Sequence, residues 1–370
     1  MLVCGVDSST QSTKVELRDI GSGELVAAGA APHPTTSPPR SEQHPADWWQ
    51  ALEAALGQVG PWLEDVGAIS VAGQQHGLVV LDHQGQVLRP AKLWNDTESA
   101  SAAASLVAQL GAEAWAQRCG SVPVAAFTIT KLAWLAHAEP ETFAAVRKVM
   151  LPHDWLTFTL SGRHVTDRGD GSGSGWWSPA TGAVDIGLLE LVDAERDWSG
   201  VVPEVLDPFV AVGPITAEAA ARTGLPVDCL VAAGTGDNMG AALGLGLRPG
   251  DVVVSLGTSG TVYAVSAHPT ADPRGFVAGF ADASGAFLPL VCTLNATGVT
   301  DVFQRLLGME RDEFTAAALD SPAGANGLVL VPYMDGERTP NMPAASATLS
   351  GIRRDVTRAD IARASHEGVV

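Results

Sequence analysis

Two carboxylates stand where an apolar run meets a turn of small residues: Asp7 in GVDSSTQSTK (5–14) and Asp237 in GTGDN (234–238). Asp7 ends a strand-like run, so its side chain could hold Mg²⁺ directly or through water. Asp237 precedes a helix-like segment, where a carboxylate is most often an N-cap. At a cleft the same carboxylate could act as a general base toward a hydroxyl, and Asn238 would offer a donor and an acceptor to a polyol.

Two short turns rich in hydroxyl groups are candidate phosphate sites. The first turn lies within residues 8–14, and the second is Gly-Thr-Ser-Gly at 257–260. Backbone N–H groups of a tight turn can converge on an anion, and Ser and Thr hydroxyls add donors. Taken alone, each turn is more often a plain hairpin, and the Walker pattern GxxxxGK[ST] is absent from the sequence.

A further group of polar and aromatic residues is typical of a sugar site. GQQHG (73–77) and LWND (93–96) place amide, imidazole and indole groups between apolar segments. Amides and imidazole suit sugar hydroxyls, and an indole face suits C–H groups. Taken singly, a loop histidine and a core tryptophan are the more common fates of His76 and Trp94.

The composition limits the function classes. The 41 Asp and Glu against 22 Lys and Arg give a net charge of −19, which argues against sequence-independent binding of nucleic acid or an anionic membrane. The four cysteines form no CxxC pair, so we expect neither a zinc site nor a disulfide framework. The first residues, MLVCGVDSST, lack the basic start of a signal peptide. We therefore expect a cytoplasmic protein.

The pattern of elements indicates two related domains. Strands are expected at 2–7 and 14–18 around the first turn, and two strand-like runs surround the second turn within 251–265. This repeated order of strand, hydroxyl-rich turn and strand suggests two domains that face each other across a cleft. We place them at residues 1–246 and 247–370.

Two helices carry start signals. The segment 47–60 is expected to begin with a capping box of Asp47 and Gln50. The segment 357–370 is expected to begin at Thr357, with Asp360 three residues later. The apolar end of this segment indicates that the chain stops within its second domain.

Taken in order, eight segments resemble motifs of the FGGY family of carbohydrate kinases. They are GVDSSTQSTK, GQQHGLV, LWND, LPHDWL, DGSGSG, GTGDN, SLGTSG and PYMDGERTP, and together they span nearly the whole chain. The family belongs to the superfamily of sugar kinases, Hsp70 and actin. The resemblance therefore implies an α/β fold of two ribonuclease H-like domains around an interdomain cleft, with the second domain incomplete here.

The resemblance also implies roles for individual residues. Asp237 would be the catalytic base, and Asp7 would act through Mg²⁺. The ketose would be contacted by Gln75, His76, Asp237 and Asn238, with Trp94 close by. The residues near the ATP phosphates would be Thr10, Gln11, Ser12, Lys14, Gly257, Thr258 and Ser259.

The segment GQQHGLV is most similar to family members that phosphorylate D-xylulose at its C5 hydroxyl with MgATP. The usual Met of that segment is Gln75 here, so another ketose or polyol stays open as the substrate. The family's adenine-binding motif would follow residue 370, so we expect this chain to bind ATP weakly. A homodimer is compatible with the resemblance. A non-catalytic sugar-binding relative and, last, an actin-like or Hsp70-like ATPase are the alternatives.

Overall fold

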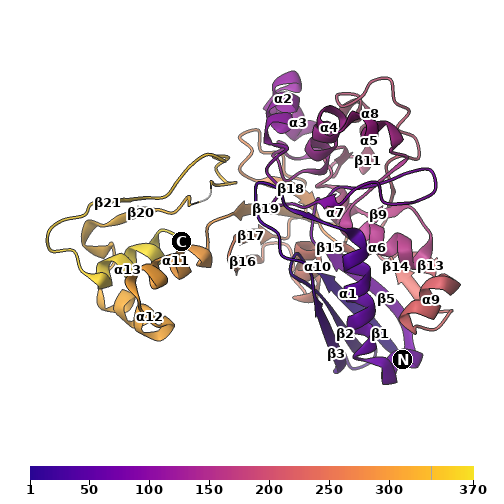
Figure 1. The fold of residues 1–370 in the computed structure, drawn as a ribbon, viewed down its shortest axis with the longest axis horizontal. Helices are drawn as coiled ribbons and strands as arrows, with labels where there is room; N and C mark the ends of the chain where they lie inside the picture. Colours follow the sequence, from indigo (N-terminus) through magenta and orange to yellow (C-terminus); the bar gives the residue numbers. More distant parts are fainter. Residues whose placement is uncertain (335) are drawn as a thin grey trace. The chain divides into compact units, whose positions relative to one another are not determined.

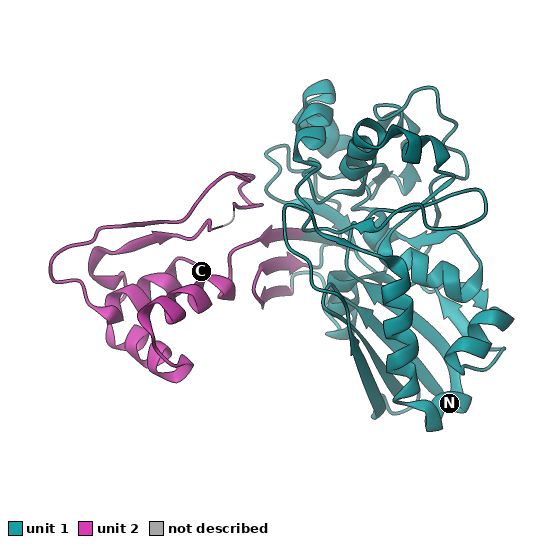
Figure 2. Cartoon of the chain, viewed as in Figure 1, with its two compact units in different colours: residues 1–250, 265–289 teal, residues 251–264, 290–370 magenta. Residues whose placement is uncertain are grey.

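The computed structural model of the chain describes residues 1–334 and 336–370 (Figure 1). Asp335, within the PYMDGERTP segment, lies outside the described residues. Two compact units are distinguished: unit 1 comprises residues 1–250 and 265–289, and unit 2 comprises residues 251–264 and 290–370 (Figure 2). Within the described ranges no helix has the length and apolar character needed to cross a bilayer.

Unit 1 is built on a mixed β-sheet. Its strands run in the order β13 (Ala211–Pro214), β14 (Leu230–Ala232), β5 (Val66–Gly73), β1 (Leu2–Ser8), β2 (Ser12–Asp19) and β3 (Leu25–Pro32), and β15 (Thr235–Gly236) also pairs with β5. Strand β5 is parallel to β1, β14 and β15, whereas β2 is antiparallel to both of its neighbours, β1 and β3. Antiparallel and parallel pairs thus meet at β1.

The alternating pattern of the first two strands explains their place in the sheet. Cys4 and Val6 of β1 and Val15 and Leu17 of β2 are buried, while the charged residues of β2 between and beside them are exposed. A strand with this period-two pattern buries one face and solvates the other. The two strands expected around the first turn are therefore confirmed, and they form an antiparallel hairpin.

Helix α1 (Pro45–Gly57) packs beside this sheet and buries Trp48 and Leu52 in the same core. It begins two residues earlier than the sequence predicted. His44 is the N-cap, its Nδ1 accepts a hydrogen bond from the backbone N–H of Ala46 (3.2 Å), and proline occupies the first helical position. The expected capping box of Asp47 and Gln50 is wrong. The fixed φ of Pro45 suits the first turn of a helix, and the imidazole of His44 serves as the cap.

Helices α6 (Pro152–Ser161) and α9 (Ala217–Thr223) contribute to the same core as α1. A second core of unit 1 is rich in tryptophan, with Trp115 and Trp198 almost completely buried. Its helices are α2 (Ala100–Leu110), α3 (Ala112–Cys119), α4 (Thr128–Ala138), α5 (Pro140–Ala145) and α8 (Ile186–Leu189). Two cores stabilise the one unit that holds most of the candidate site.

The remaining elements of unit 1 are short. They are β4 (Glu42–Gln43) paired with β7 (Ala91–Lys92), β6 (Val79–Leu81) with β8 (Lys148–Met150), β9 (Val165–Asp167) with β12 (Glu204–Leu206), β10 (Trp177–Ser178) with β11 (Ala183–Val184), β18 (Ala278–Ala281), η1 (Gly60–Asp65), α7 (Arg168–Gly171) and α10 (Asp237–Gly244). Helix α10 follows β15 directly, so a strand end leads into a helix start at Asp237.

Unit 2 contains the second expected hairpin. Strands β16 (Val252–Leu256) and β17 (Gly260–Ala264) pair antiparallel, and β17 pairs with the 290–293 part of β19 (Phe287–Thr293). The other elements are α11 (Thr297–Leu307), α12 (Arg311–Asp320), η2 (Ala325–Gly327), β20 (Val329–Val331), β21 (Thr348–Ser350) and α13 (Arg358–Glu367). The expected cap of α13 is confirmed, since Thr357 and Asp360 form a capping box.

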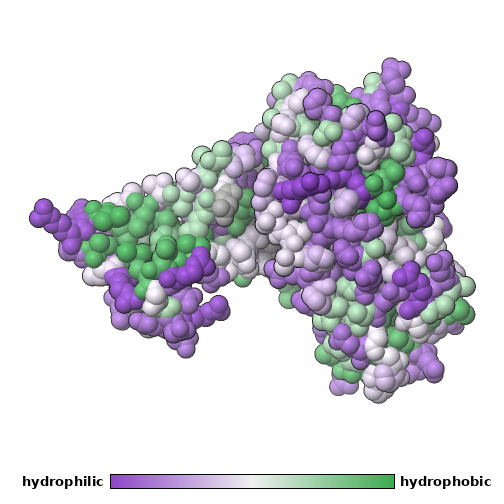
Figure 3. Space-filling model, in the orientation of Figure 1, coloured by the Kyte–Doolittle hydropathy of each residue, from purple (hydrophilic) through white to green (hydrophobic). Residues whose placement is uncertain are grey.

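Unit 2 also exposes apolar side chains, which gather on the face seen in Figure 3. On β20, Val329 and Val331 are both exposed, at 55% and 41%. Contiguous apolar surface of this kind commonly marks a place where another polypeptide packs.

Candidate active site

Three parallel strands of unit 1 end side by side and bring distant residues together. Asp7 of β1 lies opposite Ala72 of β5, and Thr235 of β15 lies opposite the same Ala72. Functional groups of α/β proteins gather at the carboxyl ends of parallel strands. Residues 74–76, which follow β5, and residues 237–238, which follow β15, therefore lie at the edge where Asp7 also ends its strand.

Asp237 is the first residue of α10, and Gly236 is the N-cap of that helix. The N-cap interpretation of Asp237 is therefore wrong. Its Oδ1 accepts hydrogen bonds from the backbone N–H (2.8 Å) and the Nδ2 (3.0 Å) of Asn238. Burial raises the pKa of Asp237 to about 7; the bonds from Asn238 oppose this, and the negative charges of Asp170 and Asp7 reinforce it. A carboxylate with this pKa is suited to take a proton from a hydroxyl at neutral pH.

Gln75 connects the β5 loop to this carboxylate. Its Oε1 accepts a hydrogen bond from Asn238 Nδ2 (2.8 Å), the same nitrogen that donates to Asp237. The side chain is 6% exposed and lies against the backbone of Gly236, where an added Cβ would come within 2.7 Å of the Gln75 Cγ. Within the described part of the chain, Gln75 Nε2 has no hydrogen-bond partner. A buried amide that lacks a partner is costly, so this nitrogen is a natural contact for a bound ligand.

His76 is buried beside a carboxylate that the sequence did not single out. Its Nδ1 lies 3.0 Å from Asp170 Oδ1, and its backbone N–H donates to the same oxygen (3.1 Å). The backbone φ of His76 is +63°, which is unusual for a residue other than glycine. Asp170 therefore fixes both the backbone and the ring of His76.

Asp170 belongs to a buried ionic cluster that sequence reasoning missed. The Nε2 of His153 lies 3.3 Å from Asp154 Oδ1, 3.3 Å from Asp167 Oδ1 and 3.6 Å from Asp170 Oδ2. Asp167 Oδ2 also accepts a hydrogen bond from Thr235 Oγ1 (2.7 Å), two residues before Asp237. The available signal was the presence of charged residues in apolar surroundings, in LPHDWL and DRGDGSG.

The cluster is best described as an imidazolium among carboxylates. Burial alone would lower the pKa of His153, but the neighbouring carboxylates, Asp154 first, raise it to about 9. Burial raises the pKa of Asp154 and of Asp170 to about 7 each, and the charge of His153 opposes both shifts. Buried charges of this kind are costly, and here one imidazolium lies within 3.6 Å of three carboxylates and offsets part of that cost.

Trp94 joins the LWND segment to the first turn. Its Nε1 donates a hydrogen bond to Thr10 Oγ1 (3.0 Å), and that hydroxyl donates to Gln74 Oε1 (3.2 Å). The side-chain amide of Gln43 donates to the carbonyl of Thr10 (2.9 Å). The turn is thus held from three sides, which fixes the direction of its backbone.

The first turn closes as a hairpin, with the backbone N–H of Ser9 bonded to the carbonyl of Ser12 (3.0 Å). Gln11 is exposed and Ser12 is partly exposed, so both can meet a ligand. Asp7 Oδ2 lies 3.8 Å from Lys14 Nζ. Burial raises the pKa of Asp7, and Lys14 opposes the shift.

The residues of this turn fit a Mg²⁺ ion that is bound mainly by phosphate. Mg²⁺ usually keeps several waters and takes one or two carboxylates together with substrate phosphates. Asp7 supplies one partly buried carboxylate next to a turn rich in hydroxyl groups, which matches that donor set.

The second turn, in unit 2, is also held by its neighbours. The carbonyl of Gly257 accepts hydrogen bonds from the backbone N–H (2.9 Å) and Oγ1 (2.6 Å) of Thr297, and the carbonyl of Thr258 accepts one from the N–H of Ala296 (3.1 Å). The turn therefore rests on the start of α11. Gly257 and Thr258 are exposed and Ser259 is partly exposed, as a turn that contacts phosphate requires.

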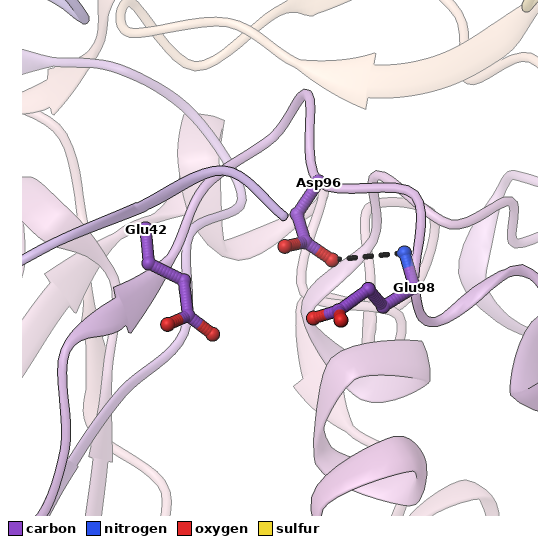
Figure 4. A group of neighbouring side chains, drawn as sticks. All are labelled: Glu42, Asp96 and Glu98. Carbon is purple, nitrogen blue, oxygen red and sulfur yellow. Dashed lines mark hydrogen bonds between the residues drawn. The ribbon is translucent and has the colours of Figure 1, made fainter. Parts of the chain in front are cut away.

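A group of three acidic side chains has the spacing of metal ligands. Glu42, Asp96 and Glu98 place carboxylate oxygens within 4.8 Å of one another, and Figure 4 shows the backbone N–H of Glu98 bonded to Asp96. The ammonium of Lys92, 0% exposed, lies 3.3, 2.9 and 2.5 Å from the three carboxylates. The cation of this group is therefore a lysine, and the cluster is an ion-pair network.

The chain matches the sequence models of one family along almost its whole length. Residues 2–244 match the N-terminal domain of the FGGY family of carbohydrate kinases, and residues 252–370 match its C-terminal domain. The chain is similar to a xylulose kinase of Streptomyces coelicolor (50% identity over 372 residues) and one of Streptomyces rubiginosus (49% over 372 residues). Both alignments cover 100% of this chain and 74% of the relative.

The fold is likewise similar to that of solved structures. The crystal structure of xylulose kinase from Bifidobacterium adolescentis superposes with a TM-score of 0.86 at 43% identity, over 100% of this chain and 80% of that one. The predicted α/β fold of two family domains is confirmed. The chain belongs to the FGGY family of carbohydrate kinases.

Proposed function

We propose that this chain transfers the γ-phosphoryl group of ATP to the C5 hydroxyl of D-xylulose, giving D-xylulose 5-phosphate and ADP. The relatives at 49% and 50% identity are named xylulose kinases, which supports this choice of reaction. The observation that carries the proposal is Asp237, a carboxylate with a pKa of about 7 beside two amide side chains at the shared end of β5 and β15.

In the proposed reaction Asp237 is the catalytic base. The C5 oxygen forms a bond to the γ-phosphorus while the bond from that phosphorus to the leaving oxygen of ADP breaks. The hydroxyl proton passes to a carboxylate oxygen of Asp237. Phosphoryl transfer depends mostly on alignment and on neutralising phosphate charge, so the base contributes a part of the acceleration, about 10²- to 10⁴-fold.

The sugar is held by groups of unit 1. Asn238 and Gln75 offer amide groups, and the Gln75 Nε2 has no partner within the described residues. His76 offers a ring nitrogen, and Trp94 offers an indole face while its N–H is bonded to Thr10. Hydroxyl groups of a ketose can use all of these donors and acceptors.

The phosphates are held by the two turns. In this proposal residues 1–246 form the domain with the sugar groups and the first turn, and residues 247–370 contribute the second turn. The nucleotide contacts are Thr10, Gln11, Ser12, Lys14, Gly257, Thr258 and Ser259. Asp7 would hold Mg²⁺, which when bound neutralises phosphate charge.

The test is the rate of ADP formation with a panel of acceptors: D-xylulose, D-ribulose, L-xylulose, xylitol and glycerol. We expect the highest kcat/KM with D-xylulose. A preference for another acceptor would replace D-xylulose as the assigned substrate. Gln75, which stands in place of the usual Met, is the reason to test other acceptors. ADP formation that is independent of any sugar would point to an ATPase, and sugar binding without ADP formation would point to a non-catalytic sugar-binding protein.

A further inference from the structure

We propose that Asp170 is a positioning residue, which sets the hydrogen-bonding face that His76 presents to the sugar, and that His153 supports it with its charge. The inference rests on the proposed function, in which His76 binds the sugar. Asp170 itself has no place in the proposed chemistry, since the base is Asp237 and the metal ligand is Asp7.

The contacts of His76 give Asp170 control of its ring nitrogens. Asp170 Oδ1 lies 3.0 Å from His76 Nδ1, and the same oxygen accepts the His76 backbone N–H at 3.1 Å. The Asp170 carboxylate can only accept, so the ring Nδ1 is the donor of this bond and carries a proton. In the neutral ring this makes Nε2 a hydrogen-bond acceptor, able to receive a sugar hydroxyl.

Packing on several sides prevents the His76 ring from rotating out of this position. His76 stacks on Phe127 (centroids 5.5 Å apart, planes at 17°) and lies against Phe280 (5.0 Å). On a further side lies the backbone of Gly173, where an added Cβ would come within 1.9 Å of the His76 ring. Packing thus fixes the plane of the ring, and Asp170 determines which nitrogen bears the proton.

The charge of His153 explains how Asp170, a fully buried carboxylate, can position the His76 ring. Asp170 is 0% exposed, and its Oδ2 lies 3.6 Å from His153 Nε2. Asp170 Oδ2 has no hydrogen-bond partner among the described residues, so the nearby imidazolium is its main compensation. The positive charge of His153 is itself supported by Asp154 and Asp167, each 3.3 Å away.

The cluster offers a matched pair of variants. Asp170→Ala and Asp154→Ala each remove one carboxylate beside His153 and the side-chain acceptor of one backbone N–H, from His76 and Leu151 respectively. Both residues are 0% exposed. Only Asp170 contacts His76, so a difference between the variants separates positioning of the ring from general support of the cluster.

The first measurement is D-xylulose affinity by calorimetry, together with kcat and KM for D-xylulose. We expect Asp170→Ala to weaken sugar binding and raise KM by about 10- to 100-fold, the range of one charged hydrogen bond, with kcat at saturating sugar changed far less. Asp154→Ala should keep the affinity within about threefold, because Asp154 does not contact the ring of His76. Equal losses in both variants would overturn the inference.

The second measurement reads the ring directly, by ¹⁵N NMR of the histidine side chains, with the His76 signal identified by its loss in His76→Gln. In the wild-type chain we expect His76 to have a protonated Nδ1 and an unprotonated Nε2. An unprotonated Nδ1 would overturn the inference without any Asp170 variant, so the test survives if Asp170→Ala does not fold. Failure of the wild-type chain to bind D-xylulose would remove the proposed function and the inference together, whereas binding that Asp170→Ala leaves unchanged would remove the inference alone.

Discussion

Replacing Asp237 by Asn should cost activity and raise stability at the same time. Asn cannot accept the hydroxyl proton, so kcat should fall by about 10²- to 10⁴-fold, equivalent to about 2.7–5.4 kcal/mol of barrier. The Asn oxygen can still accept from the backbone N–H and Nδ2 of Asn238, which now hold Asp237 at 2.8 and 3.0 Å. Sugar binding should therefore survive in part.

The gain in stability follows from the raised pKa of Asp237. The value is about 7 in the folded chain against 3.8 for an unperturbed aspartate. Below pH 3.8 the group is protonated in both the folded and the unfolded state, and it has no net effect. As pH rises from 3.8 to 7 the unfolded state ionises first, so stability is lost, up to about 4 kcal/mol above pH 7. Asn does not titrate and avoids this loss.

Thermal unfolding at pH 4 and pH 8 checks the gain in stability, and steady-state kinetics check the loss of activity. We expect Asp237→Asn to unfold roughly 5 °C above wild type at pH 8 and close to wild type at pH 4. Asp65→Asn, at an exposed aspartate, is the control and should change neither property. A variant that keeps its kcat within threefold would refute the role of Asp237 as base. A variant that is less stable than wild type at pH 8 would refute the argument from burial.

Three further predictions concern the same site and its support. In a pH–rate profile, kcat/KM should fall tenfold per pH unit below about 7, because protonated Asp237 cannot take the hydroxyl proton, and a flat profile down to pH 5 would contradict this. Gln75→Met removes the acceptor of the 2.8 Å bond from Asn238 and should change kcat/KM for D-xylulose about 3- to 10-fold; identical acceptor preferences in both proteins would show that Gln75 does not act on the sugar. Lys92→Met leaves three carboxylates without their shared cation and should lower the free energy of unfolding by about 3–5 kcal/mol in urea titrations, and an unchanged midpoint would mean that the network contributes little.

Much of the fold was predictable because its signals are local. The alternation of Val15 and Leu17 with charged residues determines which face of β2 is buried. The capping box of Thr357 and Asp360 needs only residues three apart. The start of α1 was predicted wrongly, because an aspartate with Gln three residues later gives the same local pattern as a real cap, while the actual cap is His44.

The buried cluster was not predictable because the contacts that assemble it are long-range; only His153 with Asp154 and Asp167 with the backbone N–H of Asp170 are local pairs. His76 and Asp170 are 94 residues apart, and Asp167 and Thr235 are 68 apart. Each of these residues alone has an ordinary structural explanation. Only the packing of α6, α7 and the β5 loop against one another brings their charges within hydrogen-bond range.

The most direct test of the central claim is ³¹P NMR of a reaction that contains this chain, MgATP and D-xylulose, run beside the Asp237→Asn variant. The account predicts a phosphate ester on C5 of the sugar, formed in equal amount to ADP, and its formation at least about a hundredfold slower with the variant. Inorganic phosphate as the main product, or equal rates of ester formation by both proteins, would contradict it.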